Sequence, residues 1–249
     1  MKRKFAAIFT LALAAGCAAP SFAIAGDAAA ILKQIRDKYD GYSSSLQDMV
    51  MTQTISIPTP QGELKQTGQY FKKGNKFRVD SNMDLGPAGS MKTIVIHDGE
   101  RTTLIAPIGG KRVLSDTESR QYKKEEAPWQ FIDDNASLAG EEAVEGRPAY
   151  VIETKNERAQ AMKYWIDKES LQIVQGELSE GSDELRWIYS DFRELEKGFE
   201  MPFRTHSYVN GAAAATIQVE SITLNANLDD ALFDPEKAEV PAASLNLRQ

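Results

Sequence analysis

The residue types that most often catalyse reactions are sparse in this sequence, and their spacing fits no familiar site. The two histidines, His97 and His206, occur outside the H-E-x-x-H and H-x-x-E-H patterns of zinc enzymes. His97 precedes an Asp-Gly turn, where a role in the hairpin is expected. His206 lies within an expected strand, and no other ligand types surround it at metal-binding spacing. No G-x-S-x-G nucleophile elbow is present, and the one cysteine is Cys17, near the start of the chain. The sequence therefore predicts neither a metal site nor a nucleophile–base pair.

Two further patterns with chemical potential also favour structural roles. Adjacent carboxylates occur at Asp133-Asp134 and Asp229-Asp230, in polar connecting segments where such residues commonly cap helices. The glycines of "PIGGK" lack the spacing of a phosphate-binding loop. We therefore predict that the protein is not an enzyme, needs no cofactor and acts by binding.

The stretch "GQYFKKGNKFRVD", residues 68–80, alternates aromatic and basic side chains around a Lys-Gly-Asn turn. Such a pattern could belong to a nucleic-acid surface, an ordinary hairpin or one wall of an apolar pocket. Nucleic-acid binding needs a net basic face, because phosphate neutralisation supplies most of the affinity. The chain carries a formal charge of −7, with 29 basic and 36 acidic side chains. We therefore predict no nucleic-acid partner.

The N-terminal residues resemble an export signal. Three cations occur in residues 1–4, an apolar run follows over residues 5–15, and Ala23-Ile24-Ala25 forms an A-x-A cleavage site. We predict a secretory signal peptide over residues 1–25 and a single periplasmic domain over residues 26–249. The stretch before Cys17 is similar to a lipobox but has Ala14 three residues before the cysteine, so the A-x-A site favours a soluble product. A lipidated Cys17 would instead anchor the protein at the outer membrane.

The elements that follow are one helix and many strands. Ile31, Leu32, Ile35 and Tyr39 form a single apolar stripe, which predicts an N-terminal helix. Alternation of period two then predicts strands throughout residues 46–115 and 148–225, with a hairpin at Asp98-Gly99. Residues 116–140 interrupt this rhythm and are charged, apart from an apolar cluster after Pro128. We predict that this insert is a helical lid, whose apolar residues are Trp129, Phe131 and Ile132.

The expected strands carry apolar side chains on both faces. In "LRWIYSDF", Trp187 and Tyr189 share one face and Ile188 and Phe192 share the other. A sheet with one solvated face would alternate apolar and polar residues, so both faces are expected to be covered. The sequence thus predicts one large antiparallel sheet that curls, with a cavity for an apolar ligand on one side.

Several motifs together resemble those of the periplasmic lipoprotein carriers of the LolA type. They are the helix "ILKQIRDKYDGYSSSLQDMVMTQTI", the stretch "GQYFKKGNKFRVD", the hairpin "IVIHDGERTTLIAP" and the terminal "ALFDPEKAEVP". The resemblance implies a mainly β fold with some helix, in which a curved, unclosed antiparallel half-barrel has an N-terminal helix and a central helical lid. The cavity would lie between the sheet and the lid. We predict that Tyr70, Phe77, Trp165, Trp187 and Tyr189 line it.

One position departs from the family pattern. In these carriers a basic turn contains an arginine followed by a proline. The arginine side chain holds the lid by hydrogen bonding to the backbone of the lid. Here the matching residues are Lys73 and Gly74, and a lysine offers a point charge where arginine offers a planar fork of donors. Lys73 is therefore the candidate for the lid contact.

The function that the resemblance implies is the carriage of an acylated lipoprotein or a lipid between membranes. An inner-membrane donor complex and an outer-membrane acceptor would be its partners. The alternatives are an outer-membrane lipoprotein anchored through Cys17, and an envelope sensor or structural module that uses the same half-barrel to bind a protein.

Overall fold

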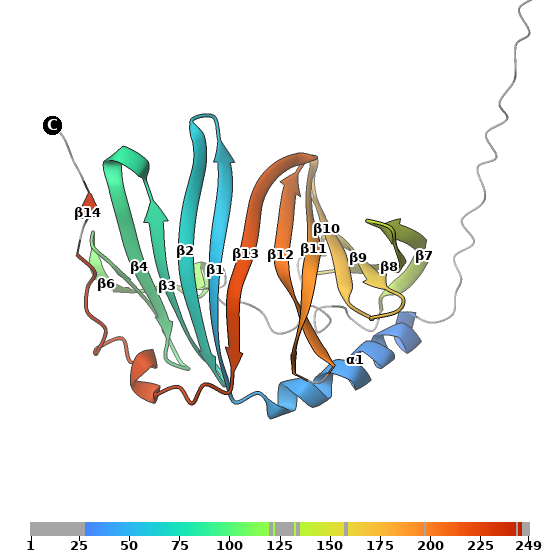
Figure 1. Cartoon of the computed structure of the whole chain (residues 1–249), viewed down its shortest axis with the longest axis horizontal. Coiled ribbons are helices and arrows are strands. Elements are labelled where there is room, and N and C mark those ends of the chain that lie inside the picture. The colour runs from blue at the N-terminus through green and yellow to red at the C-terminus, as the bar shows by residue number, and fades with distance from the viewer. Residues whose placement is uncertain are drawn as a thin grey trace, which may run out of the picture.

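The computed structural model describes residues 28–119, 122, 132, 135–156, 159–196, 198–242 and 244–245. The predicted signal peptide and Cys17 lie outside these residues, as do Trp129 and Phe131 of the predicted lid. Helix α1 spans Ala28–Ser45 and is followed by a sheet whose strands are almost all consecutive hairpins (Figure 1). Among the described residues, no helix is long and apolar enough to cross a membrane.

The first part of the sheet contains β1 (Asp48–Thr59), β2 (Gly62–Lys73), β3 (Lys76–Asp84), β4 (Gly89–His97), β5 (Thr102–Ala106) and β6 (Gly110–Val113). The second part contains β7 (Ser137–Val144), β8 (Arg147–Lys155), β9 (Ala161–Asp167), β10 (Ile173–Glu180), β11 (Asp183–Glu196), β12 (Phe199–Val209) and β13 (Ala212–Leu224). Short helical elements are η1 (Gly86–Ala88), α2 (Asp116–Ser119) and η3 (Asp230–Phe233), and β14 (Ser244–Leu245) pairs with β4.

The strand order is β6-β5-β4-β3-β2-β1-β13-β12-β11-β10-β9-β8-β7, and every described pair is antiparallel. The two parts join where β1 pairs with β13. The edge strands β6 and β7 stand at opposite sides of the sheet, so the half-barrel is unclosed (Figure 1). The predicted mainly β fold, with an unclosed antiparallel half-barrel and an N-terminal helix, is therefore confirmed.

The hairpin inside "GQYFKKGNKFRVD" shows how local sequence sets the register. Lys73 pairs with Lys76 across the two-residue turn Gly74-Asn75, and Gly74 has a φ of 56°. Two-residue hairpin turns need positive φ, which glycine adopts without strain. Because side chains alternate along a strand, this turn also decides which residues of β2 and β3 face the same side.

We call the face of the sheet on which α1 packs the inner face, and the opposite face the outer face. Figure 1 shows α1 running below the lower ends of β8 to β12. Its apolar stripe packs on the inner side chains of β7 to β10. This α1 cluster contains Ala28, Ile31, Leu32, Ile35, Tyr39, Ile132, Leu138, Ile152, Tyr164, Ile166 and Ile173. The α1 cluster closes one half of the inner face.

The outer face of β2 to β5 is covered by the segment after β13. Phe233 of η3 and Ala238 are buried against Ile96 and Ile105, and Phe71 packs at the edge of the same cluster. Burial of a phenylalanine side chain contributes roughly 1.5–3 kcal/mol. The C-terminal segment therefore accounts for the apolar outer face that the sequence shows in this part of the sheet.

The predicted lid insert, residues 116–140, ends earlier than expected. Residues 137–140 belong to β7, which pairs with β8 from Ser137↔Glu153 to Val144↔Arg147. A register shift between Leu138 and Gly140 disturbs the alternation of this strand. The apolar period is therefore too weak in "SLAGEEAV" to predict a strand from sequence.

Candidate functional site

Two of the predicted wall residues, Tyr70 and Phe77, lie side by side on the inner face. Tyr70 is opposite Met51 on one side and Val79 on the other. The rings of Tyr70 and Phe77 stack with centroids 6.3 Å apart, and both side chains are buried. They form a second inner cluster, the Tyr70 cluster, with Met51, Val95, Phe203 and Val219. The stretch "GQYFKKGNKFRVD" is therefore a hairpin in which Tyr70 and Phe77 face the inner side of the sheet and Phe71 faces the outer side.

Trp187 and Tyr189 also lie on the inner face, on β11, and pack at the edge of the α1 cluster. The pairing register places them on the same face as Ile55 of β1. Tyr189 pairs with Thr205, Thr205 with Ile217, and Ile217 with Ile55. The Trp187 indole covers Gly176 of β10 so closely that a Cβ there would lie 2.3 Å from the ring. The absence of a side chain at Gly176 therefore leaves the space that the Trp187 indole occupies.

Trp165, the fifth predicted wall residue, faces the other way. It alternates along β9 with Tyr164 and Ile166, which belong to the α1 cluster. Its neighbours are Val144, Ala149, Val151 and Val174 on the outer face, and its Nε1 donates a hydrogen bond to Glu142 Oε2 at 2.8 Å. We therefore leave Trp165 out of the candidate inner site.

Beyond the two inner clusters, apolar side chains continue along the sheet toward the β1–β2 and β3–β4 turns. Their register places them on the inner face: Ile55 pairs with Ile217 and Met83 pairs with Met91. They are only half-buried and belong to none of the buried clusters among the described residues. This upper inner wall consists of Ile55, Ile57, Leu64, Met83, Met91 and Ile217.

Two described residues of the predicted lid insert contact both halves of the inner face. Tyr122 packs against the Tyr70 cluster, and Ile132 is buried in the α1 cluster. Arg36 of α1 donates from Nη2 to the Ile132 carbonyl oxygen at 3.3 Å. An arginine therefore does hold the backbone of the insert, but it comes from α1 and not from the β2–β3 turn.

Lys73, the predicted lid contact, is bonded to the C-terminal segment instead. Its Nζ donates to the Leu228 carbonyl oxygen at 2.7 Å and lies 3.4 Å from Asp230 Oδ1. Lys76 reaches the same carboxylate at 3.3 Å, and Arg78 donates to the Leu232 carbonyl oxygen at 3.3 Å. The cations of this hairpin thus clamp the segment that covers the outer face.

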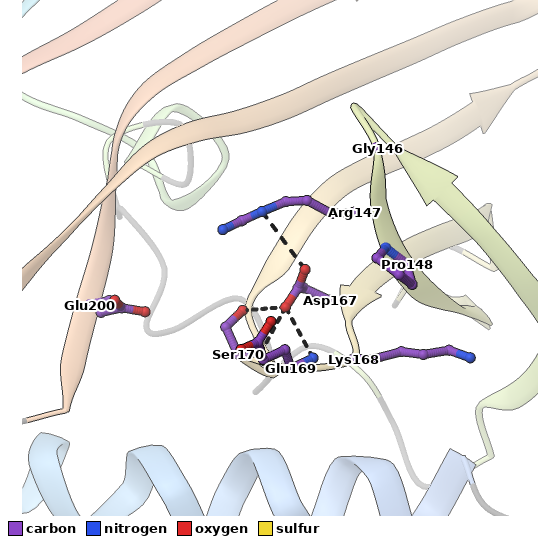
Figure 2. A pocket seen from close by; sticks show the side chains of 8 residues that line it. All are labelled: Gly146, Arg147, Pro148, Asp167, Lys168, Glu169, Ser170 and Glu200. Atoms are coloured by element: carbon purple, nitrogen blue, oxygen red, sulfur yellow. Dashed lines mark hydrogen bonds and ion pairs between the residues drawn. The ribbon is translucent and has the colours of Figure 1, made fainter.

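A polar pocket of about 490 Å³ lies beside α1, at the lower end of β8, β9 and β12 (Figure 2). Figure 2 shows Arg147 and Asp167 pointing toward one another, with Glu200 across the pocket. Asp167 Oδ1 accepts hydrogen bonds from the backbone nitrogens of Glu169 and Ser170 and from Ser170 Oγ. Burial alone would raise the pKa of Asp167, but these hydrogen bonds and the Arg147 charge hold it below its ordinary value.

The turn beside that pocket anchors α1. Lys38 Nζ and Tyr39 Oη both donate to the Ser170 carbonyl oxygen, at 2.8 and 3.1 Å. Because the pocket's charged groups are engaged with one another and with this turn, it suits a structural role better than an apolar ligand. Among the described residues, no group of histidines and carboxylates is placed to hold a metal ion.

Burial of Tyr70 and Tyr189 makes the stability of the protein sensitive to alkaline pH. Burial raises the pKa of each phenol to about 12, partly offset at Tyr189 by a hydrogen bond with Trp187. An unfolded tyrosine ionises near pH 10. Below that pH both states keep the proton, and between about pH 10 and 12 only the unfolded state loses it, so the free energy of unfolding should fall.

Denaturant titrations from pH 9 to 12 should therefore show a steeper loss of stability in the wild type than in a Tyr70→Phe/Tyr189→Phe variant. The expected difference in slope is roughly 1.4 kcal/mol per pH unit for each tyrosine. Identical slopes would mean that neither phenol is desolvated in the folded protein.

With this geometry described, the chain can be compared with known proteins. No protein-family model matches the sequence, and no curated protein does either. Among solved structures, a DUF1329 family protein from Desulfovibrio piger is 14% identical, covers 82% of this chain and 95% of its own, and superposes with a TM-score of 0.62. A protein domain named for outer membrane lipoprotein sorting, from Vibrio parahaemolyticus, is 8% identical, covers 83% of this chain and 96% of its own, and has a TM-score of 0.60. The chain shares their fold.

The shared fold confirms the half-barrel that the resemblance implied. Met83 and Met91 of the upper inner wall were not among the predicted wall residues, because strand alternation alone does not say which face of the sheet is the inner one. The alternation Ile55-Ser56-Ile57 was a usable signal, since it places two isoleucines on the side of Met51. Arg36 carried no signal, because a single arginine on the polar side of a helix is ordinary.

Proposed function

We propose that the protein is a periplasmic carrier that sequesters the acyl chains of a lipid or lipoprotein against the inner face of its half-barrel. The upper inner wall carries this proposal, because its six apolar side chains are half-buried and lie outside every described core cluster. Apolar surface of this kind marks a binding site more often than a free surface. An acyl chain that covers it gains about 0.8 kcal/mol for each CH₂ group removed from water.

The insert supports the same function. Among its described residues, Tyr122 packs on the Tyr70 cluster and Ile132 in the α1 cluster, and Arg36 donates a hydrogen bond to the Ile132 carbonyl oxygen. A carrier must release its cargo, and a segment laid on the face of a sheet can open at a lower free-energy cost than the core strands. The family resemblance adds transfer between an inner-membrane donor and an outer-membrane acceptor, and the signal-like N-terminus adds the periplasm.

Binding can be followed through the two described tryptophans, which lie on opposite faces. An acyl ligand on the inner wall should change the surroundings of Trp187, while Trp165 stays packed on the outer face beside Glu142. Emission should shift when a medium-chain fatty acid is added. Of the emission shift that arises from Trp187 and Trp165, Trp187→Phe should remove most. The matched control Trp165→Phe should leave the emission shift unchanged.

The carrier proposal also predicts the content of the purified protein. Material isolated from its native periplasm should carry acyl lipid, which native mass spectrometry would detect as a mass above that of the chain. Lipid-free protein that also fails to bind a fluorescent acyl probe would contradict the proposal. It would favour the alternative in which the half-barrel binds a protein partner.

A further inference from the structure

We propose that a polar row across the inner wall recognises the carbonyl groups of an ester- or amide-linked acyl lipid. This inference rests on the proposed carrier function and adds the chemistry of the linkage that the site selects. Gln53 of β1 pairs with Gly68 of β2, Gly68 with Ser81 of β3, and Ser81 with Thr93 of β4. These residues, which we call the polar row, cross four neighbouring strands side by side.

The polar row lies between two apolar rows on the same face. On each strand, the residue two positions nearer α1 belongs to the Tyr70 cluster or packs against it. The residue two positions farther from α1 lies at the level of the upper inner wall. The row nearer α1 is Met51, Tyr70, Val79 and Val95. The row farther from it is Ile55, Gln66, Met83 and Met91, in which Gln66 is the one polar side chain. Two residues of a strand span roughly 7 Å, so the side chains of both neighbouring rows lie within a few methylene groups of a carbonyl at the polar row.

Two hydroxyls in the row are available to a ligand. Ser81 and Thr93 are half-buried, and in the part of the chain that the structure describes their side chains form no hydrogen bond. A plain hydrocarbon laid over them would expel water and leave both hydroxyls without a partner, which disfavours its binding. A lipid carbonyl in the same place would accept their hydrogen bonds. Gln53 is already engaged within the protein.

Gly68 leaves space for that carbonyl in the middle of the row. Its backbone does not have the positive φ that would require glycine. A Cβ there would lie 3.5 Å from the Asp80 carbonyl oxygen and 3.9 Å from Ser81 Oγ, which are ordinary contacts. Neither conformation nor packing therefore demands a glycine, although glycine weakens a strand. The missing side chain creates a notch that faces the inner side of the wall.

The test compares two lipids that differ only at the linkage. Dioctanoylglycerol carries two ester carbonyls, and dioctylglycerol is its ether analogue without them. Displacement of a fluorescent acyl probe from the full chain should show the ester binding about five-fold more tightly for each carbonyl that is bonded. In Ser81→Ala/Thr93→Val the ester should lose its advantage over the ether, and the ether should bind at least as tightly as it does to the wild type, because no hydroxyl is left without a partner. Ser56→Ala/Thr54→Val makes the same changes on the outer face and should keep the wild-type ratio.

The outcomes separate this inference from the carrier proposal. If the wild type binds both lipids with equal affinity, the polar row does not distinguish an ester from an ether linkage, although the carrier proposal stands. If neither lipid binds, the carrier proposal itself fails. If Ser81→Ala/Thr93→Val weakens both lipids alike, the hydroxyls only support packing, and the inference is wrong.

A second variant tests the notch without removing any hydrogen bond. Gly68→Val should fill the space and weaken both lipids by at least ten-fold, with circular dichroism and the denaturation midpoint preserved, because valine suits a strand. Unchanged affinity in that variant would overturn the placement of the linkage. Relative binding of an N-palmitoyl peptide and dioctanoylglycerol then tells whether an amide or an ester is the better source of the carbonyl.

Discussion

Ile55→Glu should weaken binding of a fluorescent acyl probe by about 100-fold or more while the protein still folds. Ile55 is half-buried on the upper inner wall and belongs to no described core cluster, so a glutamate there remains hydrated in the free protein. An acyl chain that covers this position must strip water from the carboxylate. Desolvating an unpaired charge costs several kcal/mol, which the few methylene contacts at this position do not offset. Probe titrations measure the loss, and urea denaturation checks the fold.

The adjacent residue supplies the control for this experiment. Thr54 points to the outer face, where it pairs with Thr67 and Gln218. Thr54→Glu places the same charge one position away on a polar surface, so probe affinity should remain within two-fold of the wild type. Equal losses in the two variants would show that the probe does not bind on the inner wall.

The fold followed from the sequence because its signals are local. The Gly74-Asn75 and Asp98-Gly99 turns and the period-two alternation each act over a few residues. β7 was missed for the opposite reason. Its alternation breaks at the register shift near Gly140, and its place in the sheet depends on pairing with β8.

The candidate site was predicted only in part, because strand parity does not say which face is the inner one. Trp187 and Ile188 were correctly separated onto two faces, and only the contact of Trp187 with the α1 cluster identifies the inner one. Trp165 was assigned to the cavity from its size and hydrophobicity, although it stands on the outer face. Lys73 was placed by family resemblance, and its partner, the Leu228 carbonyl oxygen, lies 155 residues away in sequence.

Phe233→Ala should strongly destabilise the protein through the outer face. Phe233 is 1% exposed and is packed with Ile96, Ile105 and Ala238. Truncation of a buried phenylalanine to alanine typically costs about 3–5 kcal/mol, since it removes apolar contacts and leaves a cavity. Lys73, Lys76 and Arg78 would still hold the residues just before Phe233, so the cavity cannot close freely. Urea denaturation should show a lower midpoint, whereas Val240→Ala, at a residue 46% exposed, should change it little.

The same variant separates the roles of the two faces. Because Phe233 lies behind the sheet from Ile55 and Met83, its loss should leave acyl-probe affinity unchanged at temperatures where the variant is folded. A second class of probe sites in Phe233→Ala would mean that the uncovered Phe71, Ile94, Ile96 and Ile105 surface can also hold an acyl chain. The C-terminal segment would then confine the ligand to the inner face by covering an equally apolar outer one. Affinity that falls together with stability would instead show that the inner wall needs this segment for its shape.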